Sequence, residues 1–253
     1  MPITVKSSRE IELMTEAGRI LEIVHKELEK ALHPGMTTKA IDCLGEEIIR
    51  SYGCIPSFLD YNGYPASICV SVNDEVVHGI PSEHRIIREG DIVSLDAGVI
   101  YKGYHSDAAR THCVGEVSKE AQDLVRVTRE CFFEGIKYAK EGNHLFDISG
   151  AIGRYAEERG YGVVRDLCGH GIGTALHEAP EIPNYEMKRK GVLLKAGMTL
   201  AIEPMINIGG WEVDWMDDDW TVVTRDHSLS AHYENTVLIT ENEPKLLSLT
   251  EGI

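Results

Sequence analysis

An internal duplication is the feature that most constrains the fold of this 253-residue chain. The segment GDIVSLD at 90–96 is matched by GMTLAIE at 197–203, which lies 107 positions later. Four further matches follow in the same order, at offsets of 99 to 127 residues. They pair Gly35 with Gly142, Tyr52-Gly53 with Tyr161-Gly162, HGIP (78–81) with HEAP (177–180), and H-x-D (105–107) with H-x-E (232–234). Repeats this long are not solenoid units, so the sequence predicts two similar lobes that close on a shared axis.

Each half of the chain has the same order of expected elements, two helices followed by strands. A capping-box pattern at Ser7 and Glu10 starts the first helix, and Pro34-Gly35 ends it. The expected helices are 7–32, 37–52, 118–140 and 145–159, and the expected strands are 68–72, 91–100, 105–114, 162–166, 198–206, 221–224 and 232–239. The sequence therefore predicts one α+β domain over residues 1–253, with αα-then-ββ repeats at approximately 7–115 and 117–240.

Composition excludes several classes of protein. The formal charge of −16 argues against a general nucleic-acid binder, which needs a basic face. The N-terminus does not resemble a signal peptide, and no run of ~18 apolar residues is present. The six cysteines form no C-x-x-C pair, so we expect free thiols. We expect a cytoplasmic protein with no membrane span, and we expect the acidic run of WEVDWMDDDW (211–220) to be a solvated loop.

The duplication sets Asp96 opposite Glu203 and Asp107 opposite Glu234. Asp96 and Glu203 lie within the apolar runs IVSLDAGVI and LAIEPMI, which look like buried strands. An unpaired buried carboxylate is costly, so each needs a partner. For one carboxylate alone, a salt bridge to a basic neighbour such as Arg110 is the ordinary solution. For four that meet at one axis, a shared solution is required.

Metal ions would supply that shared solution. Four converging carboxylates carry about −4 and raise one another's pKa values, whereas two divalent cations supply about +4. Oxygen ligands with one imidazole and no thiolate suit Mn, Fe(II), Co or Zn, and ions ~3.5–4 Å apart support metal-assisted hydrolysis. The glycine-rich segment LCGHGIGTALHEAP (167–180) holds His170 and His177, and could be a metal site, a catalytic pair or a plain loop.

The sequence resembles the type I methionine aminopeptidases of bacteria from end to end, in their short form without an N-terminal zinc-binding extension. The motifs that carry the resemblance are NGYPASICVSVNDEVVHGIP (62–81), DAGVIYKGYHSDAART (96–111), CGHGIGTALHEAP (168–180), IEPM (202–205) and AHYENT (231–236). The resemblance implies the pita-bread fold, an α/β domain with pseudo-two-fold symmetry around a curved, mainly antiparallel sheet. That fold agrees with the duplication.

The resemblance also assigns roles to individual residues. It implies a dinuclear metal centre whose ligands are Asp96, Asp107, His170, Glu203 and Glu234. Asp107 and Glu234 would bridge the two ions, and Glu203 would also handle the proton of the attacking water. His78 and His177 would hydrogen-bond the substrate and steady the tetrahedral intermediate.

Two further histidines precede bridging carboxylates by two positions. His105 stands before Asp107 and His232 before Glu234. They are candidates to orient these carboxylates from positions outside the ligand set, and ordinary packing is the alternative.

The implied activity is removal of the N-terminal methionine from nascent proteins when the second residue is small, by attack of a hydroxide held at the dinuclear centre. Contact with the free α-amine implies that a formylated substrate must first be deformylated. The implied partners are nascent polypeptide N-termini, with ribosome docking as a further expectation, and the protein is expected to be a monomer.

The methionine side chain needs an apolar, adaptable pocket. The resemblance places Phe58, Tyr61, Tyr64, Cys69, Leu176 and Trp220 around it. Ordinary core packing is the alternative for each aromatic residue, most of all for Phe58. Leu176 departs from the family, in which a bulkier aromatic residue is usual, so we expect a roomier or differently shaped pocket.

Two other functions remain as alternatives. An aminopeptidase P or prolidase would have the same fold, but these relatives usually carry an extra N-terminal domain. A binding module on this fold would have lost its metal ligands, whereas all five ligand positions are retained here.

Overall fold

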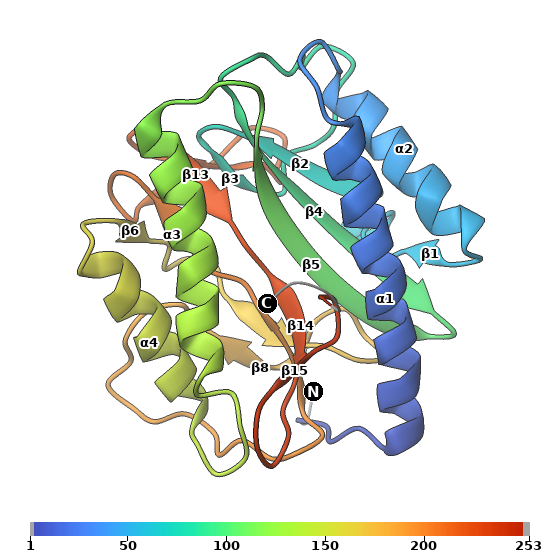
Figure 1. Cartoon of the computed structure of the whole chain (residues 1–253), viewed down its shortest axis with the longest axis vertical. Helices are drawn as coiled ribbons and strands as arrows, with labels where there is room; N and C mark the ends of the chain where they lie inside the picture. The colour runs from blue at the N-terminus through green and yellow to red at the C-terminus, as the bar shows by residue number, and fades with distance from the viewer. Residues whose placement is uncertain (1–2, 250–253) are drawn as a thin grey trace.

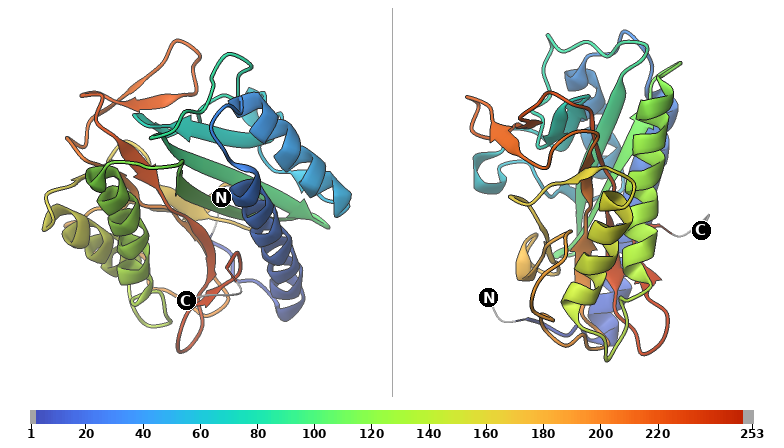
Figure 2. Two further views of the ribbon diagram at one scale, coloured as in Figure 1. Left: turned by 45° about the horizontal axis from the view of Figure 1, so that its top comes forward. Right: turned by 90° about the vertical axis from the view of Figure 1, so that its left-hand side faces the viewer.

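The computed structural model describes residues 3–249. Two pairs of helices cover one face of the sheets, as Figure 1 shows. In the side view of Figure 2, short strands and loops form the opposite face. The helices are α1 (Ser8–Ala31), α2 (Thr38–Ser51), α3 (Lys119–Ile136) and α4 (Leu145–Glu157), with a short 3₁₀ turn at Tyr61–Gly63.

The strands form antiparallel sheets, two of which are built around the predicted repeats. The first-half sheet consists of β1 (Ile55–Pro56), β2 (Ile68–Val72), β4 (Ile92–Tyr101) and β5 (Tyr104–Cys113). The second-half sheet consists of β15 (Lys245–Leu246), β14 (Asn235–Leu238), β9 (Thr199–Ile202), β7 (Gly169–Gly171) and β8 (Glu178–Ile182). Two smaller sheets contain β13 (Ser230–His232), β10 (Met205–Asn207) and β6 (Gly162–Val163), and β11 (Val213–Trp215), β12 (Val222–Thr224) and β3 (Glu75–Val77).

Each half of the chain has its own apolar core. The core of the first half includes Leu21, Ile41, Val70 and Leu95, from α1, α2, β2 and β4. The core of the second half includes Phe132, Ile148, Leu200 and Val237, from α3, α4, β9 and β14. Burial of these apolar side chains supplies the main driving force for folding, and it places both helix pairs on the same side of the sheets (Figure 2).

The halves meet where β5 passes beside β14. The Ala109 amide donates to the Glu234 carbonyl at 3.4 Å, and the Glu234 amide donates to the Ala109 carbonyl at 3.0 Å. The Asp107 amide donates to Oγ1 of Thr236 at 2.8 Å. Asp107 and Glu234, which the duplication pairs, therefore lie at the junction of the two lobes.

The predicted helices are present with small differences in length. Ser7 and Glu10 form the predicted capping box at the start of α1. The helix predicted over 118–140 ends at Ile136. The chain after α3 makes shorter-range turn bonds, and Lys140 then forms a bridge with Thr240, so a tertiary contact ends the helix early.

Two predicted strands are interrupted, and both interruptions fall at a predicted metal ligand. The strand expected over 198–206 divides into β9 and β10 at Glu203-Pro204. The strand expected over 232–239 divides into β13 and β14 around Glu234. Proline has no amide hydrogen to donate to a sheet. Pro204 thus accounts for the first interruption, and both glutamates stand outside the regular strands.

Among the described residues, no helix combines the length and the apolar composition needed to cross a bilayer.

Candidate metal centre and substrate pocket

One cavity of about 120 Å³ brings together every site residue predicted from the sequence. It is lined by the predicted ligands Asp96, Asp107, His170, Glu203 and Glu234, by His78 and His177, and by Phe58, Tyr61, Tyr64, Cys69, Leu176 and Trp220. Asn62 also lines it and was not predicted. Its left-handed backbone, with φ of 51°, lies in the NGYP motif, which is the signal that could have found it.

The four carboxylates reach this cavity from both halves. Asp96 lies on β4 and Asp107 on β5, while Glu203 follows β9 and Glu234 precedes β14. Asp96, Asp107 and Glu234 are buried, and the Glu203 side chain is 14% exposed. Within residues 3–249, the buried oxygens Asp96 Oδ1, Asp107 Oδ1 and Glu234 Oε1 have no hydrogen-bond partner. Unpartnered buried carboxylate oxygens of this kind require a cation or a proton.

Burial and mutual repulsion favour the protonated forms of these acids. Burial raises the pKa of Asp107 to about 7. Burial, followed by the charges of Asp107 and Glu203, raises the pKa of Asp96 well above its ordinary value. Burial and the charge of Asp107 also raise the pKa values of Glu203 and Glu234. Without a cation, four charges cannot be held here at neutral pH.

His170 completes the cluster from the second half. Its Nδ1 lies 2.9 Å from the Gly171 carbonyl, so this nitrogen carries the hydrogen and Nε2 has a free lone pair. Burial lowers the pKa of His170 to about 3 and keeps the ring neutral. Nevertheless Nε2 lies 3.5 Å from Glu203 Oε1 and 3.8 Å from Asp107 Oδ2. A lone pair that faces ionised carboxylates is an unfavourable contact unless a cation or a proton lies between them.

The donor set therefore fits a metal centre. One ligand atom from each of Asp107, His170 and Glu234 lies within 4.8 Å of the other two. The set contains oxygen and imidazole nitrogen donors with no thiolate, as divalent hydrolytic metals prefer.

The position of His170 depends on close strand packing. The residue lies on β7, opposite Ala201 of β9 and Glu181 of β8. A Cβ atom on Gly171 would lie 2.2 Å from the Ala179 carbonyl oxygen. The glycine-rich segment is therefore in part a central strand, which the sequence did not predict, because glycine repeats are more typical of loops.

His105 and His232 have different surroundings. His232 Nε2 lies 3.7 Å from Glu203 Oε2 and 4.0 Å from Glu234 Oε2, and neither ring nitrogen has a hydrogen-bond partner among the described residues. The ring of His105 instead bonds Ser57 Oγ at 3.0 Å. The structure thus brings His232, and not the His105 ring, against the glutamates.

The two predicted substrate histidines, His78 and His177, line the same cavity as the carboxylate cluster. The His177 ring lies 4.2 Å from that of His170 between centroids, and its Nδ1 is 3.1 Å from the Tyr61 hydroxyl. Burial lowers the pKa of His78 to about 4 and also lowers that of His177. Each ring is therefore neutral near pH 7 and has one N–H to donate.

Aromatic rings form the apolar wall. Tyr64 and Trp220 meet edge to face at 5.1 Å, and the Tyr64 hydroxyl donates to the Gly79 carbonyl at 2.9 Å. Phe58 and Leu176, only 7% and 2% exposed, belong both to this wall and to the neighbouring apolar core. These contacts hold the rings in place without blocking the cavity.

The acidic run leads directly to this wall. Asp217, Asp218 and Asp219 are exposed and lie outside the strands, as expected of a solvated loop, whereas Asp214 is exposed but lies on β11 and pairs with Arg225 at 3.0 Å. Asp218 also accepts from the Trp220 amide at 2.9 Å and from the Thr221 amide at 2.8 Å. This aspartate therefore fixes the turn that delivers Trp220 to the cavity.

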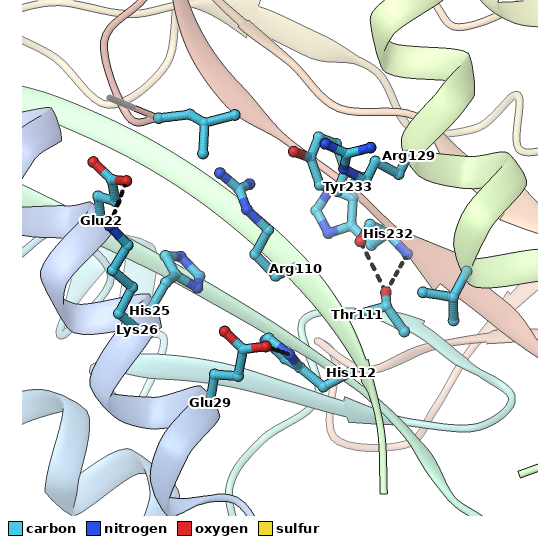
Figure 3. Close-up of a pocket in the computed structure, with 12 residues that line it drawn as sticks. Glu22, His25, Lys26, Glu29, Arg110, Thr111, His112, Arg129, His232 and Tyr233 are labelled. Atoms are coloured by element: carbon cyan, nitrogen blue, oxygen red, sulfur yellow. Dashed lines mark hydrogen bonds and ion pairs between the residues drawn. The ribbon is translucent and has the colours of Figure 1, made fainter. Parts of the chain in front are cut away.

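A larger cavity, of about 280 Å³, lies between α1 and α3 (Figure 3). Arg110 faces it and donates to the carbonyls of Ala109 and Glu234 and to Asn235 Oδ1. Arg110 therefore supports the backbone of Glu234 and does not form the alternative salt bridge to Asp107. The cavity has no cluster of converging carboxylates, so the smaller cavity is the candidate site.

Comparison with known proteins places this arrangement in a family. The family model for metallopeptidase family M24 matches residues 12–241. The chain is 54% identical to the methionine aminopeptidase of Clostridium acetobutylicum, over 98% of this chain and 100% of that protein. The crystal structure of a methionine aminopeptidase from Thermotoga maritima, 45% identical, superposes with a TM-score of 0.96 and covers 98% of this chain and 100% of its own.

The proline-directed relatives are more distant. Prolidase from Pyrococcus furiosus is 26% identical with a TM-score of 0.76, and the match covers 98% of this chain but 66% of that protein. The predicted pita-bread fold is confirmed by these structural matches. The chain therefore belongs to the metallopeptidases of family M24 and, within that family, to the methionine aminopeptidases.

Proposed function

We propose that this chain, acting as a single catalytic domain over residues 1–253, removes the N-terminal methionine from nascent polypeptides. The observation that carries the proposal is the convergence of four carboxylates and one neutral imidazole nitrogen beneath an aromatic-walled cavity. A cation-binding floor beside an apolar wall suits a substrate that pairs a polar amide with a thioether side chain.

Two divalent ions are proposed as the cofactors, with Mn, Fe(II), Co and Zn as candidates. Asp96, Asp107, His170, Glu203 and Glu234 would hold them, with Asp107 and Glu234 shared. When bound, such ions supply Lewis acidity toward the scissile carbonyl and lower the pKa of water.

The protein residues then have distinct tasks. Glu203, whose carboxylate lies 3.5 Å from His170 Nε2 and is only partly exposed, is proposed to take the proton of the attacking water and return it to the leaving amine. The N–H groups of His177 and His78 are proposed to donate to the oxygen on which negative charge develops. The neutrality of both rings suits this task, because each ring keeps one N–H to donate and adds no positive charge beside the cations.

The proposed substrate preference follows from the shape of the pocket. Phe58, Tyr61, Tyr64, Cys69, Leu176 and Trp220 would enclose the methionine side chain. The preference for a small second residue and a free α-amine is proposed from the resemblance to the methionine aminopeptidases, so formyl-methionine substrates would need deformylation first. We further propose that the protein is a cytoplasmic monomer that meets its substrates at the ribosome.

A peptide assay tests the proposal against the proline-directed alternative. Metal-depleted protein is refilled separately with Mn²⁺, Fe²⁺, Co²⁺ or Zn²⁺ and given Met-Gly-Met or an Xaa-Pro peptide. The expected result is metal-dependent release of methionine with no cleavage of the Xaa-Pro bond. Preferential cleavage of Xaa-Pro, or equal release without metal, would refute the proposed function.

A further inference from the structure

A buried ion pair lies beside the loop that carries His177. Lys6 Nζ is 2.7 Å from Glu178 Oε2, and the two side chains are only 4% and 6% exposed. The residues are 172 positions apart in the chain, and neither lines the candidate site cavity. Burying two charges carries a desolvation penalty that their attraction need not exceed, so stability alone is a weak explanation for the pair.

Glu178 closes the loop formed by residues 173–178. Its Oε1 accepts from the Ala175 amide at 3.2 Å and from Thr174 Oγ1 at 3.5 Å. Its Oε2 accepts from Thr4 Oγ1 at 2.9 Å as well as from Lys6. The carboxylate adjacent to His177 thus joins this loop to the N-terminal segment.

The backbone of Lys6 makes a second connection. Its amide donates to the Gly197 carbonyl at 2.7 Å, at the turn that leads into β9 and then to Glu203. Lys6 therefore contacts the loop that carries His177 through its side chain and the approach to Glu203 through its backbone. One residue links two elements that deliver proposed catalytic groups.

Gly173 packs directly against the ion pair of Lys6 and Glu178. A Cβ atom on Gly173 would lie 2.5 Å from Lys6 Cε and 2.5 Å from Glu178 Oε1. The Gly173 carbonyl accepts from the His105 amide at 2.8 Å, which ties the start of the loop to β5. The loop is thus fixed to β5 at one end and to Lys6 at the other.

We propose that Lys6 is a positioning residue for catalysis, which acts through Glu178 to hold the loop of residues 173–178 and thereby the His177 ring. The inference rests on the proposed role of His177 as a donor to the transition state. Tyr61 contacts the ring itself at Nδ1, whereas Glu178, the first residue of β8, follows His177 directly and holds the preceding loop through the Ala175 amide. A shift of about 1 Å in a positioned catalytic group can reduce turnover by roughly a hundredfold.

The test compares kcat and KM for a Met-Ala-Ser peptide at saturating metal in Lys6→Met, Lys6→Arg, Glu178→Gln and His177→Ala. The matched control is Lys137→Met, which breaks an exposed pair with Glu134 whose side chains are 61% and 35% exposed. Lys6→Met is expected to lower kcat at least about tenfold while KM changes less than about threefold. Lys6→Arg should recover most of the loss, Lys137→Met should have no effect, and Lys6→Met should cause no further loss in a His177→Ala background.

The outcomes separate the two proposals. A folded Lys6→Met enzyme with kcat within twofold of wild type, alongside an impaired His177→Ala enzyme, would overturn the positioning role alone. A full additional loss on combining Lys6→Met with His177→Ala would also overturn it. Unimpaired His177→Ala would overturn the role of His177 and this inference with it. If Lys6→Met does not fold, Glu178→Gln tests the positioning role instead. This substitution removes the negative charge that pairs with Lys6 but keeps an oxygen that can accept from the Ala175 amide.

Discussion

His170 Nε2 lies 3.5 Å from Glu203 Oε1, although the same ring already donates through Nδ1 to the Gly171 carbonyl. Two electron-rich atoms therefore face each other in a buried site. With Glu203 ionised, this contact is unfavourable unless a proton or a divalent cation lies between the two atoms, and burial raises the Glu203 pKa when no metal is bound. The fold thus holds a metal-binding geometry in place at some cost to its own stability.

The apparent affinity for Mn²⁺ is expected to rise as the pH increases from 5.5 to 8. Metal binding must displace protons from carboxyl groups whose pKa values are raised, including Asp107 at about 7. His170, with a pKa of about 3, contributes no proton in this range. Titration calorimetry in two buffers of different ionisation enthalpy measures both the affinity and the proton release, and a pH-independent affinity would contradict the assignment.

Metal-free Asp107→Asn protein is expected to be more stable than the metal-free wild type. Because the folded-state pKa of Asp107 is raised, its contribution to stability is present below the ordinary aspartate pKa and is lost as the pH rises through about 7. The difference in Tm should therefore widen by several degrees between pH 4.5 and 7.5. Thermal unfolding in a chelator measures it, and Asp217→Asn, at an exposed position, is the control.

Glu203→Gln is expected to lower kcat by at least roughly a hundredfold, because the amide cannot accept the proton of the attacking water. The fold should survive, since the substitution is nearly isosteric and removes a carboxylate whose pKa burial raises. Steady-state release of methionine and circular dichroism check both points, with Glu12→Gln as the exposed control. Turnover near the wild-type level in Glu203→Gln would exclude the proposed role.

Leu176→Phe is expected to raise KM for methionyl peptides several-fold with little change in kcat. The side chain is 2% exposed and lines a cavity of about 120 Å³, so a larger ring there must narrow the pocket. Overpacking of this kind also costs about 1–3 kcal/mol of stability. Peptide kinetics and thermal unfolding measure the two effects, and an unchanged KM would show that Leu176 does not contact the methionine side chain.

Much of the fold was predictable because local sequence signals mark the helices and the longer strands. Ser7 and Glu10 cap α1 as their spacing predicts. The alternating and buried runs gave β2, β4 and β5 close to their observed limits. Short strands such as β7 and β8 were not predicted, because β7 is Gly-His-Gly, β8 contains Pro180, and only tertiary pairing makes them extended.

The carboxylates of the candidate site were easier to predict from the sequence than the residues that hold the site in position. Asp96 and Glu203 attract notice because carboxylates are unusual in apolar runs, and the pairing of the two halves adds Asp107 and Glu234. By contrast, Arg110 and Lys6 act on backbone carbonyls or on distant loops, and no local pattern marks such long-range contacts. Sequence reasoning paired Arg110 with Asp107 as the ordinary alternative, and only the structure shows that it supports Glu234 instead.

Anomalous diffraction from crystals soaked in Mn²⁺ tests the central claim most directly. The claim predicts density for two ions, with His170 Nε2 and Glu203 on one of them and Asp107 and Glu234 shared between both. In His170→Ala crystals, the occupancy of the ion next to residue 170 should fall. Ions bound outside this cluster, or no ion within reach of His170 Nε2 at saturating Mn²⁺, would contradict the account.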